Sequence, residues 1–557
     1  MTDAAAWLSR FETLARMGNG VALAETFAPE SYWRDYLPFG WTLQTREGRA
    51  AIADLASAKG PATDLRDLEF EGDPGDTEGF FRFNTVDGPG RGHVRLEKGR
   101  GFTLFTMLDG LSDAAPQNAL AKADAPEVLI VGGGQCGLAL GAQLANLGVA
   151  YLIVDKHPRV GGQWRSRYDS LLLHDPVWYD HLPFMPFPDD WPIYTPKDQM
   201  ADWLETYATE LGLHIWTDTA LTAARFDAEV GTWRATVTHG GEEKTLRPRH
   251  IVVALGLSGF ANVPRLPGQD TFAGPQMHSS QYRAGDGLSG KRVVVVGANN
   301  SAHDIAADLV ANGAHPTLLQ RSSSLVVRQD DYCTRLLGPL YSAEAVESGI
   351  TTDRADILQA SMPLRVLEHT HKSLWDGIRA DRADYYRGLT EAGFTLDFAE
   401  DGTGLGMKYR RTASGYYIDV GAAEMVRDGR IGVASGAGIE RLSERAVHLT
   451  SGETLHADAV VYATGYGNMV DWIAKFMGTA VAEAVGPCWG YGSGTRGDPG
   501  PWVGEQRNMW MPTGQEALWC TGGNLSQARF FSRLLGLQLA RAVRRGGPPA
   551  EHTNPPD

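Results

Sequence analysis

Cysteine is scarce in this chain: it contributes four residues in 557, and no two of them form a C-x-x-C pair. Neither a disulfide framework nor a zinc site is therefore indicated, and we expect a reducing, cytoplasmic location with no bound metal. Positive charge is also limited, because 51 Lys and Arg stand against 67 Asp and Glu, for a net charge of -16. This balance argues against a nucleic-acid partner, since a phosphate backbone requires a basic surface.

Long apolar segments are missing as well. No basic N-terminal region leads into an apolar core, and no stretch of about 20 apolar residues is free of Gly and polar interruptions. We therefore expect no membrane span. The length of 557 residues exceeds what one hydrophobic core usually supports, which predicts two or three domains.

Glycine, by contrast, occurs in a nucleotide-binding pattern. A short apolar strand, 128–131, is followed by Gly132, Gly134 and Gly137 in the spacing G-x-G-x-x-G. The first glycine permits the tight turn, the second admits a pyrophosphate, and the third lets the following helix pack on the strand. A second apolar strand, 151–154, ends at Asp155, whose carboxylate can accept both hydroxyls of a ribose.

The same pattern returns at 293–296, followed by Gly297. Two dinucleotide sites imply two different dinucleotides. Asp155 lies 23 positions after Gly132, and the same offset from Gly297 reaches residue 320, directly before Arg321 and Ser322. An acid suits the free ribose of FAD, whereas a guanidinium suits the 2'-phosphate of NADPH.

The second turn departs from the glycine pattern. Asn299 stands where the middle glycine would be, and Ala302 stands at the position of the third. The Asn side chain narrows the approach to the pyrophosphate, although a short Asn tolerates the turn and can donate a hydrogen bond.

Residues 1–115 have a different pattern, that of an α+β unit. Trp7, Phe11 and Leu14 share one face of an expected helix, and strand-like segments follow at 68–71, 79–85, 93–97 and 102–108. The runs 32–35, 41–43 and 47–49 resemble the SnoaL-like branch of the cone-shaped NTF2-like fold. Some members of that fold use a pocket acid for proton transfer, which makes Asp35 the candidate here. A structural Asp in a packing domain is the favoured alternative, because no partner acid or base is identifiable.

Motifs across residues 126–545 together resemble the flavin-containing monooxygenases. They are the two glycine turns, Gly161-Gly162-x-Trp164, Phe272-x-Gly274-x-x-x-His278 and Ala463-Thr464-Gly465-Tyr466. The segment after His278 lacks the Trp-Pro of type I Baeyer-Villiger enzymes. With the SnoaL-like front domain, this makes the chain similar to the bacterial type II group of class B flavoprotein monooxygenases.

The resemblance implies an α/β fold with two Rossmann-like domains preceded by the NTF2-like domain. The expected divisions are 1–115 for the NTF2-like domain, 116–125 for a linker, 126–275 with 426–545 for FAD, 276–425 for NADPH, and 546–557 for a flexible tail.

The implied reaction uses FAD, NADPH (and NADH as a second donor) and O2. Reduced flavin forms a C4a-(hydro)peroxyflavin that transfers one oxygen atom to sulfur or nitrogen of a small organic substrate. Baeyer-Villiger oxygenation of ketones and an uncoupled NADPH oxidase stay open as alternatives, and a homodimer is expected. A disulfide reductase is disfavoured for want of a C-x-x-C pair.

His174 is the catalytic candidate, expected to hydrogen-bond the oxygenated flavin or NADP+, with a packed structural histidine as the alternative. His278 is expected to hold the link between the nucleotide domains. The residues expected to bind cofactors are Gly132, Gly134, Gly137, Asp155, Gln163, Trp164, Gly297, Asn299, Ser301, Arg321, Ser322, Thr464, Gly523 and Asn524.

Overall fold

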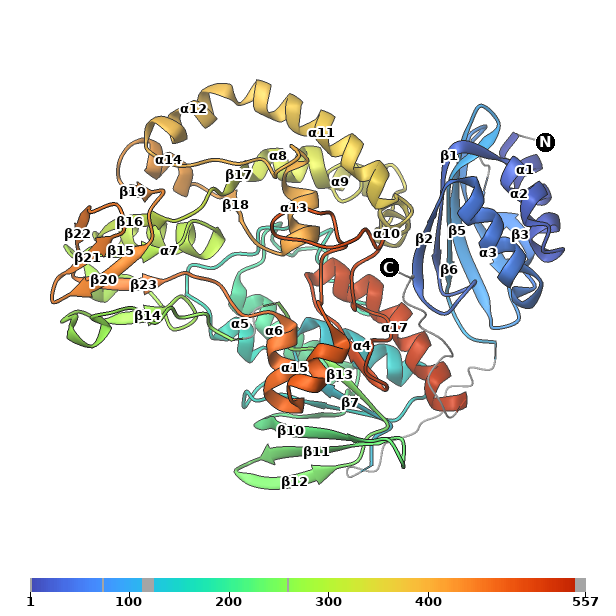
Figure 1. Ribbon diagram of the computed structural model, residues 1–557, viewed down its shortest axis with the longest axis horizontal. Coiled ribbons are helices and arrows are strands. Elements are labelled where there is room, and N and C mark those ends of the chain that lie inside the picture. Colours follow the sequence, from blue (N-terminus) through green and yellow to red (C-terminus); the bar gives the residue numbers. More distant parts are fainter. Residues whose placement is uncertain (1–2, 73–74, 113–124, 258–259, 546–557) are drawn as a thin grey trace.

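The computed structural model describes residues 3–72, 75–112, 125–257 and 260–545. Three bodies share them (Figure 1): an N-terminal domain set to one side, a unit built on β7 (Val128–Val131), and a unit built on β15 (Arg292–Val296). The expected linker, apart from residue 125, and the expected tail lie outside the described residues. Within the described ranges, no helix is both long enough and apolar enough to cross a membrane.

The N-terminal domain packs three helices against one face of a six-stranded sheet. The helices are α1 (Asp3–Arg16), α2 (Gly20–Glu25) and α3 (Gly48–Thr63). The strands lie in the order β2 (Leu43–Glu47), β1 (Phe27–Tyr36), β6 (Arg100–Leu108), β5 (Pro89–Glu97), β4 (Glu78–Asn84), β3 (Arg66–Phe70). An α+β pattern is therefore present, but the sheet is mixed rather than antiparallel, because β1 runs parallel to β6.

Aromatic side chains fill the space between these helices and the sheet. Trp7 and Phe11 stack at 5.3 Å, and they meet Phe27 and Trp33 edge-on. Asp35 lies on the same inner side, fully buried, and accepts hydrogen bonds from Thr106 Oγ1 at 2.7 Å and from the Phe39 amide at 3.0 Å. Burial raises the pKa of Asp35 to about 7, against the opposing effect of those hydrogen bonds. These contacts support the structural interpretation of Asp35, since its polar atoms are used within the domain.

The other face of that sheet rests on the remainder of the chain. Arg34 donates two hydrogen bonds of 2.7 Å to the carboxylate of Glu505 and a third to the Ala360 carbonyl. Tyr36 donates its hydroxyl to Glu505 at 2.9 Å, and its ring lies against that of Phe531. Because the Arg34 and Glu505 side chains are 8% and 4% exposed, this ion pair is buried at a boundary between domains.

The first nucleotide unit is a parallel sheet with helices on its faces. Its strands lie in the order β24 (Leu518–Cys520), β13 (His250–Val253), β7, β8 (Tyr151–Val154), β9 (Ile215–Trp216). Its helices include α4 (Gln135–Asn146), α5 (Gly162–Arg165), α6 (Lys197–Glu210) and α17 (Leu525–Arg545), with α17 packed along α4 (Figure 1). A separate antiparallel sheet contains β10 (Thr219–Asp227), β11 (Thr232–His239) and β12 (Glu242–Leu246).

The second unit repeats this arrangement. Its parallel strands lie in the order β14 (Gln276–His278), β23 (Ala459–Tyr462), β15, β16 (His315–Gln320), β19 (Gly432–Ser435), and α7 (Asn300–Ala311) follows β15. A three-stranded antiparallel sheet contains β20 (Ile439–Ser443), β21 (Ala446–Leu449) and β22 (Thr454–His456). The domain boundary expected at 426 is therefore wrong, since the chain leaves this unit only after β23. Strand pattern identifies a strand but does not say which sheet it joins.

A mostly helical segment separates β16 from β19. It contains the pair β17 (Leu325–Arg328) and β18 (Tyr416–Asp419), a π-helical turn at 332–337, and the helices α8 (Gln329–Asp331), α9 (Ala343–Glu347), α10 (Thr352–Ala360), α11 (Leu364–Asp381), α12 (Ala383–Glu391), α13 (Gly404–Thr412) and α14 (Ala422–Arg427). After β23 come α15 (Met469–Met477) and α16 (Thr479–Val485). In Figure 1 the α10 end of this segment faces the N-terminal domain.

Loss of the Glu505 charge is expected to destabilise the attachment of the N-terminal domain. Glu505→Gln leaves the Arg34 guanidinium buried without a counter-charge, which costs about 3–5 kcal/mol. We expect a lower urea midpoint, measured by Trp fluorescence. Glu78→Gln is the control, since Glu78 pairs with Arg95 from a side chain that is 57% exposed and such pairs contribute at most about 1 kcal/mol. Equal midpoints for the two variants would contradict a stabilising role for the buried pair.

Candidate active site

The first glycine turn has the geometry that a dinucleotide requires. Gly132 has φ of 117°, and a Cβ there would lie 2.5 Å from the Ala254 carbonyl oxygen. A Cβ on Gly137 would lie 1.9 Å from the Gly132 oxygen, so α4 can approach β7 only without one. A Cβ on Gly134 would meet nothing within 4 Å, and no side chain caps α4 at this residue. The turn therefore presents open space and a bare helix N-terminus, which fit a pyrophosphate.

Asp155 follows β8 beside this turn. Its Oδ2 accepts a hydrogen bond from the Gly133 amide at 2.7 Å, and its Oδ1 accepts one from the His157 amide at 2.8 Å. Burial opposes ionisation of Asp155, but the hydrogen bonds from His157 and Gly133 outweigh it and lower the pKa. The acid is thus held ionised at the edge of the turn, where it fits a ribose.

The second turn begins with a glycine that has a positive φ, as the first turn does. Gly297 has φ of 137°, and a Cβ there would lie 2.4 Å from the Ala463 carbonyl oxygen, as at Gly132 and Ala254. Asn299 has φ of -106° and does not cap α7; its Oδ1 instead accepts a hydrogen bond from Ser324 Oγ at 2.9 Å. The substitution therefore carries no backbone strain, and the N-terminus of α7 is also left without a side-chain cap.

Arg321, Ser322 and Ser301 lie around the second turn. Arg321 and Ser322 are exposed and directly follow β16, the strand beside β15. Ser301, in the first turn of α7, accepts a hydrogen bond from Arg167 of the first unit at 3.3 Å. Arg167 also donates a hydrogen bond to the hydroxyl of Tyr466, which lies in the segment after β23. One side chain of the first unit therefore contacts both α7 and that segment.

His174 lies between the two nucleotide units. Its Nε2 is 3.6 Å from Asp304 Oδ2 on α7, and the Tyr168 hydroxyl donates to the same oxygen at 2.6 Å. Burial would lower the pKa of His174, but Asp304 outweighs it and raises the pKa. Its neighbour Asp175 lines the large cavity described below, whereas His174 does not.

His278 and Thr464 hold the connections between these units. His278 Nε2 lies 3.0 Å from the Gly465 carbonyl oxygen, and Thr464 donates its hydroxyl to the Asn262 carbonyl. The first contact ties β14 of the second sheet to the segment after β23, and the second ties that segment to the one that leaves β13. The first is consistent with the linking role expected for His278.

A cavity of about 490 Å³ opens beside the first turn of α17. That turn lies against the first glycine turn, because Gln135 Nε2 donates to the Gly523 carbonyl at 3.2 Å. Asn524 and Gln527 line the cavity, and Tyr409 donates its hydroxyl to Gln527 at 2.7 Å. The cavity wall therefore adjoins the first glycine turn through Asn524, the neighbour of Gly523.

The walls of this cavity come from all three bodies. The N-terminal domain contributes Arg34, Tyr36 and Leu43, and α17 contributes Phe530 and Phe531. Further rings belong to Tyr179, Tyr332, Tyr341, Tyr409, Tyr416 and Trp510. These positions are far apart in the sequence, and no spacing pattern joins them, which is why sequence reasoning did not find the cavity.

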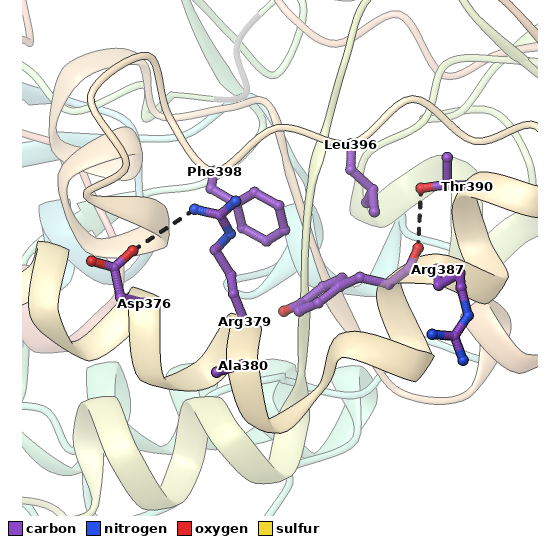
Figure 2. Close-up of a pocket in the computed structure, with 8 residues that line it drawn as sticks. Asp376, Arg379, Ala380, Arg387, Thr390, Leu396 and Phe398 are labelled. Carbon is purple, nitrogen blue, oxygen red and sulfur yellow. Dashed lines mark hydrogen bonds and ion pairs between the residues drawn. The ribbon is translucent and has the colours of Figure 1, made fainter.

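A second, shallower cavity of about 420 Å³ lies between α11, α12 and the segment 396–398 (Figure 2). Arg379 covers the Phe398 ring at 4.6 Å and pairs with Asp376, while Thr390 donates to the Tyr386 carbonyl. Asn524 and Gln527, which lie next to the first glycine turn, line the larger cavity, whereas no residue of that region lines this one. We therefore place the chemistry at the larger cavity.

Two strand-turn-helix units, each opened by a glycine in the same conformation, with a ring-lined cavity beside the first, are typical of oxidoreductases with two dinucleotide sites. Known proteins narrow this class. The chain is 30% identical over 363 residues to indole-3-pyruvate monooxygenase YUCCA1 of Oryza sativa subsp. japonica, covering 65% of this chain and 82% of that protein. It is 31% identical over 355 residues to YUCCA6 of Arabidopsis thaliana, covering 62% and 78%. Residues 129–368 match the family described as pyridine nucleotide-disulphide oxidoreductase.

Solved structures share the fold. Oxidized steroid monooxygenase bound to NADP matches with a TM-score of 0.53 and 20% identity, over 75% of this chain and 85% of that one. Cyclohexanone monooxygenase from Rhodococcus sp. Phi1 bound to NADP+ matches with a TM-score of 0.51 and 16% identity, over 76% and 85%. The chain belongs to the flavin-dependent monooxygenases, a family that uses NADPH and O2.

Gly134→Ala tests whether the first turn holds a flavin. The methyl group meets no protein atom, so the fold should persist, but it enters the space expected for the pyrophosphate. Overpacking of about 1–3 kcal/mol would weaken flavin binding about 10- to 100-fold, measured as flavin per chain after purification. Gly287→Ala, also in open space, is the control and should keep its flavin. Full flavin content in Gly134→Ala would remove the pyrophosphate from this turn.

Proposed function

We propose that the protein is an FAD- and NADPH-dependent monooxygenase that adds one atom of O2 to sulfur or nitrogen of a small organic substrate. The carrying observation is the ring-lined cavity whose wall adjoins the first glycine turn through Asn524. A bound flavin supplies the oxygen chemistry there, as cofactors do in this class. Baeyer-Villiger oxygenation of a ketone is the alternative outcome at the same site.

The chain's own part is to bind, orient and exclude water. Gly132, Gly134, Gly137 and Asp155 would hold FAD, with Gln163, Trp164, Gly523 and Asn524 around it. Gly297, Asn299, Ser301, Arg321, Ser322 and Thr464 would hold the nicotinamide dinucleotide. Within this set, Arg321 would favour NADPH over NADH, because its exposed guanidinium follows β16 where a 2'-phosphate would lie.

The N-terminal domain is proposed to be a SnoaL-like, NTF2-like domain that closes the cavity. Three helices on one face of a six-stranded sheet support that assignment. Arg34, Tyr36 and Leu43 give it a direct share in the cavity wall. The homodimer stays a prediction; the outer face of this sheet is covered by α10, α17 and the segment near Glu505 of the same chain.

A thiol-based reductase is the second candidate, because the fold brings Cys488 Sγ and Cys520 Sγ to 3.9 Å. The hydrogen bond from Cys488 and burial raise the pKa of Cys520. A thiol that resists ionisation is a poor nucleophile, and neither residue lines the cavity. This pair therefore favours packing over redox catalysis.

Labelled oxygen tests the proposed function directly. The purified holoprotein with NADPH and ¹⁸O2 should convert methyl phenyl sulfide or a tertiary amine to a product that carries one ¹⁸O atom, detected by mass spectrometry. A ketone converted to labelled ester would establish the Baeyer-Villiger alternative. The Gly134→Ala protein without flavin is the control. Consumption of NADPH with H2O2 as the only product, for all three substrate types, would contradict monooxygenation.

We propose that protonated His174 would donate a hydrogen bond to a flavin bound at the first turn and so would limit the loss of reducing equivalents as H2O2. Because Asp304 raises the folded pKa of His174, the protonated form persists to higher pH and is lost as pH rises through that pKa. H2O2 released per NADPH oxidised should therefore rise with pH in the wild-type protein. Asp304→Asn should move this rise to lower pH, and His174→Gln should give a high, flat profile. Unchanged profiles in both variants would leave His174 with a packing role.

A further inference from the structure

The acids that line the large cavity all have partners, and one of its cations does not pair with any of them. Glu505 pairs with Arg34, Asp356 accepts two hydrogen bonds from Arg529, and Glu78 pairs with Arg95. Asp175 accepts a hydrogen bond from the Tyr332 hydroxyl at 2.6 Å, and burial raises its pKa. Each of these acids therefore has a hydrogen-bond or ion-pair partner other than Arg410, the remaining cation of the cavity wall.

Arg410 lies in the middle of α13 and lines the cavity. Its Nη1 donates to the Gly406 carbonyl at 2.9 Å, and no carboxylate of the described residues lies within ion-pairing distance. The next residue, Arg411, is fully paired with Asp401 and Glu368. A guanidinium carries five N-H donors, so most of those on Arg410 have no protein acceptor. An unpaired cation in a ring-lined cavity is costly unless a ligand supplies the opposite charge.

Polar groups around Arg410 are arranged for a ligand as well. Gln506, 9% exposed, donates its Nε2 to the Arg410 carbonyl at 2.8 Å and holds that turn of α13 in place. His371 lines the same cavity, and its buried Nδ1 has no hydrogen-bond partner. Burial, with a smaller effect of Arg410, lowers the pKa of His371 to about 4. The imidazole is therefore neutral and has an N-H to donate.

Small and aromatic groups complete the surroundings of this cation. Gly406 lets the His371 imidazole pack against α13 one turn before Arg410, since a Cβ there would lie 2.3 Å from the imidazole. Tyr36 and Tyr179 line the same cavity. Burial raises the pKa of both hydroxyls, and the Arg410 charge opposes that effect. The cation thus stands among rings from two domains, within a volume of about 490 Å³ that suits a small ligand.

We infer that the substrate is an aromatic or other apolar organic acid, whose carboxylate is bound by Arg410 with His371 as a further donor. This inference rests on the proposed function and names the substrate class for it. A carboxylate matches the planar fork of a guanidinium and would form charge-assisted hydrogen bonds with it. The rings of Tyr36, Tyr179 and Tyr409 pack on the apolar part of the acid, which extends toward Asn524 and the first glycine turn.

The test compares (4-methylsulfanylphenyl)acetate with its methyl ester, which share every group except the charge. Isothermal titration of the holoprotein measures binding without turnover. The acid should bind the wild-type protein about 10- to 100-fold more tightly than the ester, the effect of charged hydrogen bonds. Arg410→Met should remove that preference and leave ester binding unchanged, while Arg410→Lys should keep part of it. Arg225→Met is the control, since Arg225 is exposed on β10 away from the cavity.

Equal affinity of the wild-type protein for acid and ester would overturn the inference, and it requires no variant to fold. So would an Arg410→Met protein that still prefers the acid, or one that loses flavin or NADPH binding while the preference persists, because Arg410 would then hold a cofactor phosphate. Oxygen transfer to the sulfur is scored separately. An acid that binds through Arg410 without becoming a sulfoxide would count against the proposed reaction and leave the carboxylate site standing.

Discussion

The buried ion pair between Arg34 and Glu505 is the contact on which the architecture of the site depends. It ties the N-terminal domain to the segment before β24, and Tyr36 and Thr45 donate hydroxyls to the same carboxylate. Two charges removed from water are tolerable because each oxygen of Glu505 has donors. With the pair in place, the N-terminal domain packs against the rest of the chain and forms one wall of the cavity.

The same steric constraint requires a glycine at the start of the turn in both nucleotide units. In each, a strand carbonyl, of Ala254 or Ala463, lies so close to the opening glycine that a side chain could not fit. The units differ at the second glycine position of the motif. Gly134 leaves open space there in the first unit, whereas in the second unit Asn299 accepts a hydrogen bond from Ser324. Arg167 and His174 lie between the units and contact α7. Groups bound at the two turns would therefore be surrounded by side chains from both units.

Much of the fold was predictable because its signals are local. Strands 128–131 and 151–154 and the helix from Gln135 occur where the apolar patterns and glycines indicated. The return of the chain to the first sheet was misplaced, since β19 and β23 join β15 and β16. Sheet membership depends on long-range pairing, which no short window of sequence contains.

The sequence by itself determined the two glycine turns, because the steric demands on their glycines come from residues close to them in the fold. Together with the motifs at 161–164, 272–278 and 463–466, these turns indicated the family. Only the tertiary structure decided where a substrate fits. Arg34, Asp175, His371, Arg410 and Phe531 come from separate elements and meet only after three bodies pack together. The unpaired charge of Arg410 is likewise invisible in sequence, because whether an arginine has a partner depends on which acids the fold brings within reach.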